Sequence, residues 1–311
     1  MHFIDGKYVS SGNKNLYVRI LGEGEPAVVI EPGWGVLSAE WLLIQEKLAE
    51  ITSVITYDRA GYGESPSNIK PRTGQQISSE LFTMLKNSGL AEPFIFIGHS
   101  SGGLYIINLL KMFPRMASGL ILVDSFTPNH NELEEYDFEL YQKYFTMKSR
   151  VEGIRNILEL DDENFAKYMD HFINNLYPFF PLEIQNQLMV YQKDKKFYET
   201  ICDEYEGFWD TIENIKNIDF FPNISLRILS RDPDVMIETY KQLGFPSEKA
   251  SEIENIWQDN QKSLLSLSNL SAHKIIKGSN HMMHITNPME IIEEARQMIE
   301  EERQNKLSFI Y

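Results

Sequence analysis

Ser100 lies at the centre of the sequence Gly-His-Ser-Ser-Gly, residues 98–102, which fits the pattern Gly-x-Ser-x-Gly. A strand-like apolar run, Phe94–Ile97, precedes it and a helical pattern, Leu104–Met112, follows it. A tight turn between strand and helix strains the serine backbone and exposes its hydroxyl, and the glycines avoid clashes with neighbouring elements. The alternative is a structural turn that happens to contain a serine. We interpret Ser100 as a nucleophile at the carboxyl end of a sheet, where open α/β sheets bind ligands.

Such a nucleophile needs a base, because a serine hydroxyl is weakly reactive near neutral pH. Two of the seven histidines, His281 and His284, follow the last strand-like run. His281 is the nearer of the two to the end of that run, and we predict that it is the base. We expect His284 to be a packing residue, or one that supports the site from behind, at the start of the final helix.

The base in turn needs a carboxylate that orients it. In enzymes with this kind of turn, the acid lies between the serine and the histidine in the chain. Asp232 and Asp234 follow the strand-like run Leu226–Leu229, and Asp124 follows the run Leu120–Val123. Aspartates also cap turns and strand ends for structural reasons. The residues alone therefore leave three candidates for one role.

The sequence gives only weak signals for phosphate binding, metal binding or cysteine chemistry. The glycine-containing segment 58–65 lacks both a Gly-x-Gly-x-x-Gly that opens a helix and a Walker lysine, and we interpret it as a structural turn near the site. His281 and His284 have no cysteine or third ligand at zinc spacing, so we expect no metal site. The single cysteine, Cys202, excludes an internal disulfide, and we interpret it as a partly buried residue rather than a nucleophile.

The elements that must position these residues alternate along the chain. Short apolar runs, several of them continuous, suggest strands that are buried on both faces. Helical patterns between them favour a mostly parallel sheet with helices on both faces. The predicted strands are Leu16–Leu21, Ala27–Ile30, Ser53–Tyr57, Phe94–Ile97, Leu120–Val123, Leu226–Leu229 and Lys274–Ile276. The predicted helices are Ala39–Glu50, Gln75–Ser88, Gly103–Phe113, Ile253–Leu267 and Met289–Arg303.

One long interval, Pro128–Pro222, interrupts this alternation, because it has helical patterns and no convincing strand. It contains 20 acidic and 9 basic residues, and 19 of the chain's 37 phenylalanines, tyrosines and tryptophans. The aromatic residues could simply form the core of a helical subdomain. They could also line a cap over a pocket for an apolar substrate, and the two interpretations are compatible.

The overall composition narrows the class of protein. The chain has 311 residues, 42% hydrophobic and 24% charged, which excludes disordered and fibrous classes. A formal charge of −16 repels nucleic-acid phosphates, so we expect no nucleic-acid partner. No stretch is long and apolar enough to span a membrane. We expect a cytoplasmic protein that acts on a small molecule, and the sequence leaves the oligomeric state open.

Four segments together resemble the α/β-hydrolase superfamily. Residues 31–35, Glu-Pro-Gly-Trp-Gly, look like its oxyanion loop, with Pro32 at a position where histidine is usual. Residues 58–65 closely resemble its Asp-Arg-x-Gly-x-Gly-x-Ser turn, and residues 98–102 its nucleophile elbow. Residues 279–284 with Pro288 resemble the superfamily's C-terminal motif, Ser-Gly-His-x-x-His followed by proline, in which the first histidine is the base.

The resemblance implies an eight-stranded, mostly parallel sheet with a helical cap inserted after the sixth strand. Residues 1–127 and 223–311 would form the core, and residues 128–222 the cap. The resemblance also implies an oxyanion hole made by the backbone N–H groups of Trp34 and Ser101. After the seventh strand the family often has the pattern Gly-x-x-Asp. Ungapped comparison with this pattern puts the acid at Asp234, although Arg231 stands at the position of the usual glycine. Some relatives have their acid after the sixth strand, which would be Asp124.

These features lead us to expect a serine hydrolase that cleaves carboxylic esters without a cofactor. Ser100 argues against dehalogenase and epoxide hydrolase chemistry, since the relatives with those activities have aspartate at the elbow. Three alternatives stay open. They are an aminopeptidase similar to the proline iminopeptidases with an acidic anchor for the amine, a C–C hydrolase or lyase with the same triad, and a non-catalytic ligand-binding relative.

Overall fold

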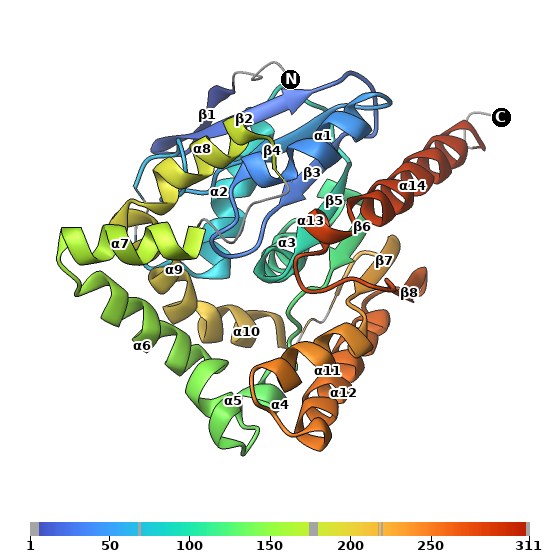
Figure 1. Cartoon of the computed structure of the whole chain (residues 1–311). Helices are drawn as coiled ribbons and strands as arrows, with labels where there is room; N and C mark the ends of the chain where they lie inside the picture. Colours follow the sequence, from blue (N-terminus) through green and yellow to red (C-terminus); the bar gives the residue numbers. More distant parts are fainter. Residues whose placement is uncertain (1–5, 68–69, 174–179, 217, 219, 309–311) are drawn as a thin grey trace.

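The computed structural model describes residues 6–67, 70–173, 180–216, 218 and 220–308. Within these residues an eight-stranded sheet has the order β1-β2-β4-β3-β5-β6-β7-β8 (Figure 1). β1 pairs with β2, and β2 with β4, in antiparallel fashion, whereas all other neighbours are parallel. The strands are β1 (Lys7–Ser11), β2 (Lys14–Leu21), β3 (Val28–Glu31), β4 (Val54–Tyr57), β5 (Phe94–His99), β6 (Ala117–Val123), β7 (Ser225–Ser230) and β8 (Ser271–Ile275).

The predicted fold class, a mostly parallel eight-stranded sheet with helices, is confirmed. β3, β4 and β5 are buried at every position, which explains their continuous apolar sequences. Six of the seven predicted strands lie in or largely overlap β2 to β7. The predicted strand Lys274–Ile276 overlaps only the last two residues of β8.

β1 was not among the predicted strands. It is an edge strand with a mostly exposed sequence, Lys-Tyr-Val-Ser-Ser, in which the side chains of Val9 and Ser11 are buried. Its pairing with β2, in the register Val9 opposite Leu16, holds it in the sheet. An edge strand with so few apolar positions has little sequence signal of its own.

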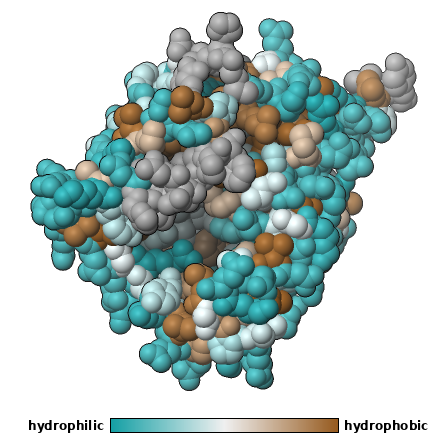
Figure 2. All heavy atoms as spheres, in the orientation of Figure 1, coloured by the Kyte–Doolittle hydropathy of each residue, from teal (hydrophilic) through white to brown (hydrophobic). Residues whose placement is uncertain are grey.

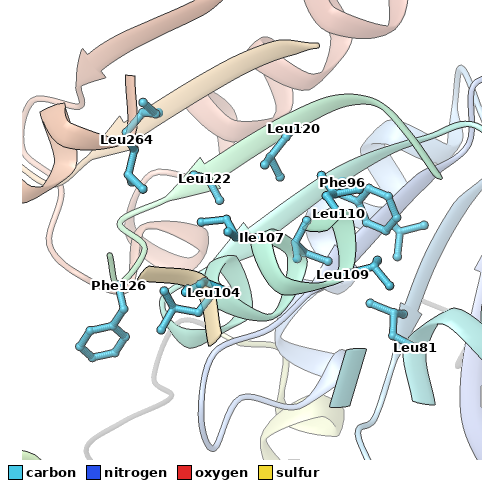
Figure 3. Close-up of a cluster of buried hydrophobic side chains, with 14 of the residues drawn as sticks. Leu81, Phe96, Leu104, Ile107, Leu109, Leu110, Leu120, Leu122, Phe126 and Leu264 are labelled. Carbon is cyan, nitrogen blue, oxygen red and sulfur yellow. The ribbon is translucent and has the colours of Figure 1, made fainter. Parts of the chain in front are cut away.

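Helices cover both faces of the sheet (Figure 1). One apolar layer joins α1 (Leu42–Ala49) and α14 (Pro288–Ser308) to side chains such as Ile30 and Ile121 of the strands. The opposite layer contains α2 (Gly74–Lys86) and α3 (Ser101–Met112). Figure 3 shows Leu104 and Ile107 of α3 near Leu120 and Leu122 of β6 in this second layer. Burial on both faces makes the central strands rigid supports for the loops at their ends.

The segment between β6 and β7 contains seven helices among its described residues. They are α4 (Asn131–Glu134), α5 (Glu139–Tyr144), α6 (Met147–Leu158), α7 (Asp162–Ile173), α8 (Leu182–Gln192), α9 (Lys195–Glu206) and α10 (Phe208–Lys216). This agrees with the predicted helical character of residues 128–222, of which 174–179, 217 and 219 lie outside the described residues. α10 packs against α2 and α3, and α6 packs against α9. That the segment works as a separate cap stays a proposal.

The chain after β7 forms α11 (Pro233–Gln242) and α12 (Ser247–Ser263), and the chain after β8 forms the short α13 (Met283–Thr286) before α14. Three 3₁₀ turns complete the elements, η1 (Ser38–Trp41), η2 (Pro114–Met116) and η3 (Leu264–Leu267). α11 was not predicted, because Pro233 and the neighbouring aspartates read as a loop. The structure shows instead a helix with Asp232 as N-cap and Pro233 as its first residue.

Candidate active site

Ser100 occupies a strained turn between β5 and α3. Its backbone has φ +53° and ψ −122°, a conformation that non-glycine residues rarely adopt. A Cβ at Gly98 would lie 2.7 Å from the Cα of Gly103, and one at Gly102 would lie 2.2 Å from the backbone oxygen of Glu31. The glycines of the pattern are therefore required by the close packing of this turn, as the sequence indicates.

His281 lies within hydrogen-bonding distance of this serine. Its Nε2 is 3.0 Å from Ser100 Oγ, and its Nδ1 is 2.6 Å from Asp124 Oδ2. The backbone oxygen of His281 accepts a hydrogen bond of 2.9 Å from His99 Nε2. Because Nδ1–H donates to the carboxylate, Nε2 is left as the acceptor for the serine hydroxyl.

Asp124 follows β6 directly and is completely buried, with φ +41°. Its Oδ1 accepts hydrogen bonds from Trp257 Nε1 at 2.9 Å and from the backbone N–H of Arg231 at 3.2 Å. Burial alone would raise the pKa of Asp124, but the Arg231 guanidinium and the hydrogen bonds from His281 and Trp257 outweigh it and lower that pKa. The carboxylate is thus ionised and held on both oxygens.

The prediction that Asp234 is the carboxylate beside His281 is wrong. Asp234 lies in the first turn of α11, its side chain is 83% exposed, and its Oδ2 is 3.5 Å from Lys277 Nζ. Asp232 caps α11 and accepts hydrogen bonds from the N–H groups of Asp234 and Gly278. The helix begins immediately after β7, and its first turn directs Asp234 into solvent.

The register of the sheet indicates that Asp124 lies near Ser100. β5 and β6 are parallel neighbours with His99 opposite Val123, so the next residue of each strand, Ser100 and Asp124, lies at the same edge. The strand order is needed to use this signal. Trp257 and the Arg231 side chain were not predicted at all, because Trp257 is 133 positions from Asp124 and nothing local in the sequence marks it.

His284 is buried away from this chain of hydrogen bonds. Its ring stacks on Trp41 with centroids 4.6 Å apart, and its Nε2 is 4.0 Å from Glu40 Oε2. Burial lowers the pKa of His284 to about 3 and raises that of Glu40 to about 8. Both groups are therefore mainly neutral at pH 7, and they form part of the packing behind His99.

The loop that was predicted to supply an oxyanion donor runs against Ser100. A Cβ at Gly33 would lie 3.0 Å from the Cβ of Ser100. The next residue, Trp34, donates from Nε1 to the Tyr105 hydroxyl at 2.8 Å, which anchors its side chain on α3. Ser101 is the first residue of α3. The loop that carries Trp34 thus packs against Ser100, and Ser101 follows the serine in the chain, but the prediction that their backbone N–H groups are oxyanion donors stays a proposal.

A buried arginine fixes this loop from behind. Arg59 donates to the backbone oxygens of Pro32 at 2.6 Å and Gly33 at 2.8 Å, and forms ion pairs with Glu31 at 2.9 Å and Glu204 at 3.0 Å. Burial by itself would lower the pKa of Arg59, but its two carboxylate partners raise it well above its usual range. The turn of residues 58–65 therefore joins the loop to α9 of the helical segment.

A cavity of about 520 Å³ opens onto Ser100 and His281. The face of the molecule in Figure 2 is hollowed near its centre. Most of the lining is apolar or aromatic, including Phe126, Phe197 and Trp257. A concave, mostly apolar pocket with a few converging polar groups is the usual form of a small-molecule site.

The described residues contain no group of three or more histidine, cysteine, aspartate or glutamate side chains arranged to hold a metal ion. No helix in the described part of the chain has both the length and the apolar character needed to cross a membrane.

Residues 26–288 match the family model of the alpha/beta hydrolase fold, and the chain belongs to that family. It is 23% identical to an AB hydrolase superfamily protein of Gibberella zeae over 295 residues. The matched region covers 88% of this chain and 86% of that protein. Seven further curated relatives match over 18% to 52% of their own length.

Solved structures share the fold at low identity. An esterase from Thermogutta terrifontis has a TM-score of 0.66 at 15% identity, over 96% of this chain and 98% of that one. The Bacillus megaterium epoxide hydrolase has a TM-score of 0.69 at 15% identity, over 94% of this chain and 100% of that one. Because relatives of this fold carry out different reactions, the chemistry has to be argued from the site.

Proposed function

We propose that this protein is a serine hydrolase that cleaves carboxylic esters through an acyl-enzyme on Ser100, with His281 as base and Asp124 as the orienting acid. The proposal is carried by one observation, the continuous chain of hydrogen bonds from the buried Asp124 carboxylate through His281 to the Ser100 hydroxyl. Such a chain is the arrangement that activates a serine for attack on an acyl carbon.

In the first half of the reaction, Ser100 Oγ attacks the ester carbonyl and His281 Nε2 takes the hydroxyl proton. Asp124 stabilises the imidazolium that forms. The backbone N–H groups of Trp34 and Ser101 donate to the carbonyl oxygen as it becomes negative. His281 then gives its proton to the departing alcohol, which leaves the acyl group on Ser100.

In the second half, water attacks the acyl-enzyme. His281 takes a proton from the water and returns it to Ser100 Oγ when the carboxylic acid leaves. The apolar lining of the cavity favours substrates whose acyl or alcohol group has a large apolar surface, because binding there removes that surface from water.

The lining also bears on the aminopeptidase alternative, which needs a carboxylate to hold a substrate amine. Among the described lining residues the one carboxyl group is that of Glu40, and its raised pKa leaves it mainly protonated at pH 7. Two arginines, Arg150 and Arg231, also line the cavity and would repel an amine. The ester hydrolase is therefore the function that we favour.

Hydrolysis of 4-nitrophenyl esters from acetate to laurate, compared between the wild type and Ser100→Ala, tests the proposal. We expect turnover in the wild type that vanishes in the variant, together with covalent labelling of Ser100 by a fluorophosphonate probe. A wild type that neither hydrolyses these esters nor reacts with the probe would contradict the proposal and favour a non-catalytic ligand-binding protein.

A further inference from the structure

One guanidinium in the cavity has no direct ion-pair partner among the described residues. Arg150, in the first turn of α6, lines the cavity and forms no ion pair with any described carboxylate. Its Nε donates to the backbone oxygen of Phe145 at 3.1 Å, which fixes the direction of the side chain. Neither terminal nitrogen of its guanidinium hydrogen-bonds to another described residue. In a segment with 20 acidic residues, an arginine turned into a mostly apolar cavity without a carboxylate partner calls for an explanation.

Further polar groups converge around this cation. Tyr141 and Tyr240 line the cavity, and both are nearly completely buried. Burial is the main cause that raises the pKa of each phenol, so both hydroxyls keep their proton at neutral pH. Arg150 and Arg231 both act electrostatically on the two phenols. The result is a cluster of donors at one end of the cavity.

Arg231 and His130 complete this end of the cavity. Arg231 is paired with Glu254 at 2.7 Å, and its Cζ lies 4.1 Å from the ring centre of Trp257. His130 is buried, and burial followed by the charges of Arg150 and Arg231 lowers its pKa to about 3. His130 is therefore neutral near pH 7 and adds no charge to this end of the cavity.

The acidic groups near this end of the cavity are bound to backbone donors and form no direct ion pair with Arg150. Glu134 interacts with it electrostatically, but the Glu134 carboxylate is bound to the backbone N–H of Met147, at 2.9 and 3.1 Å from its two oxygens. Glu40, in η1, lines the cavity, and its Oε1 accepts a hydrogen bond from the backbone N–H of Leu37. Among the described residues, the cavity therefore presents a guanidinium without a direct carboxylate partner, together with two phenols, at one end.

From this cluster we infer that the cavity binds a substrate that carries a carboxylate, which pairs with Arg150 and accepts hydrogen bonds from Tyr141 and Tyr240 while the ester group lies at Ser100. The inference rests on the proposed function and specifies its substrate class, an ester with a free carboxylate on its acyl or its alcohol part. A guanidinium is well suited to a carboxylate because its donors are planar and can bind both oxygens.

Matched ester pairs test this inference. For the acyl side, 4-nitrophenyl hydrogen adipate is compared with 4-nitrophenyl hexanoate. For the alcohol side, 3-(4-acetoxyphenyl)propanoate is compared with 4-propylphenyl acetate. We expect the anionic member of one pair to have a kcat/KM roughly 10- to 100-fold higher than its neutral partner, as charge-assisted hydrogen bonds in a partly buried site allow. Equal or lower kcat/KM for the anionic member of both pairs would overturn the inference.

Substitutions in α6 test whether Arg150 causes the preference for the anionic ester. Arg150→Gln should lower kcat/KM for the anionic ester much more than for the neutral one, so that the preference is lost, and Arg150→Lys should keep part of the preference. Arg155→Gln is the matched control, since Arg155 is on the same helix but is exposed and paired with Glu206. It removes the same charge and should leave the preference intact. A preference that persists unchanged in Arg150→Gln would overturn the assignment.

Binding to an inactive protein separates this inference from the proposed function. Isothermal titration of Ser100→Ala with adipate should show binding that weakens at least about tenfold when Arg150→Gln is added. If no ester is hydrolysed but this binding is seen, the proposed function fails and the carboxylate site stands. If neutral esters are hydrolysed through Ser100 and adipate does not bind, the carboxylate site fails and the proposed function stands.

Discussion

The Oδ2 atom of Asp124 lies 2.6 Å from Nδ1 of His281, although 157 positions separate the two residues in the chain. Parallel pairing of β5, β6 and β7 produces this contact, because it brings the end of β6 beside the nucleophile turn. His281 comes from the loop after β8, on the far side of β7. The site is thus built from three separate strand ends around Ser100.

Trp257 should be needed for full activity, because its Nε1–H donates to the buried Asp124 carboxylate. Trp257→Phe keeps most of the ring and removes this donor, and hydrogen bonds to charged groups are worth about 1.5–3 kcal/mol. We expect kcat to fall roughly tenfold or more in ester hydrolysis assays. Trp209→Phe, a change in α10 outside the cavity lining, is the control and should stay within about twofold of the wild type. Equal activity in both variants would show that the Trp257 hydrogen bond is dispensable.

Gly102→Ala should damage both folding and activity. The new Cβ would lie 2.2 Å from the backbone oxygen of Glu31 and 2.6 Å from that of Pro32, so backbone of the oxyanion loop would have to move. We expect a clear fall in Tm in thermal unfolding, together with loss of turnover.

Gly153→Ala provides the comparison for this change. Gly153 is in the interior of α6, and nothing lies within 4 Å of a Cβ placed there. Alanine should stabilise the helix by about 0.5–1 kcal/mol. A Gly102→Ala protein as stable and active as Gly153→Ala would contradict the close packing of the turn.

Glu40 should make stability depend on pH in a specific direction. Burial raises its pKa from 4.5 to about 8 in the folded protein. Between these values the unfolded chain releases a proton that the folded protein retains, so the free energy of unfolding falls as pH rises through this window. Glu40→Gln can still accept the hydrogen bond from Leu37 and removes the titration.

Urea unfolding from pH 4 to pH 9 measures this effect. The free energy of unfolding of Glu40→Gln, relative to that of the wild type, should rise steadily between about pH 5 and pH 8. Below about pH 4.5 the difference in this free energy between the two proteins should stay constant. A difference between the two proteins that stays constant over the whole range would contradict the raised pKa of Glu40.

Most of the sheet could be predicted because its central strands are buried on both faces and therefore read as continuous apolar runs. β1 was missed because Lys7–Ser11 is an edge strand with few apolar positions. α11 was missed because Pro233 is at its first turn, where proline is favoured, and not at its end.

The candidate site could be predicted where local sequence determines it. The turn around Ser100 requires its glycines, and His281 lies in the loop that follows the last strand of the sheet. The carboxylate could not be chosen in this way, because Asp124 and Asp234 both follow strands. The choice depends on which strand lies next to β5 and on the helix that begins at Pro233, and both are properties of the folded chain. Trp257 and Arg150 reach the cavity from helices whose orientation no local pattern specifies.

The most direct test of the triad compares Asp124→Asn with Asp234→Asn in ester hydrolysis. An amide at position 124 favours the wrong tautomer of His281, and loss of this carboxylate in a working triad lowers kcat by about ten-thousand-fold. Asp234→Asn changes an exposed helix residue and should stay within about twofold of the wild type. If Asp234→Asn lost as much activity as Asp124→Asn, or if Asp124→Asn kept most of its activity, the proposed triad would be contradicted.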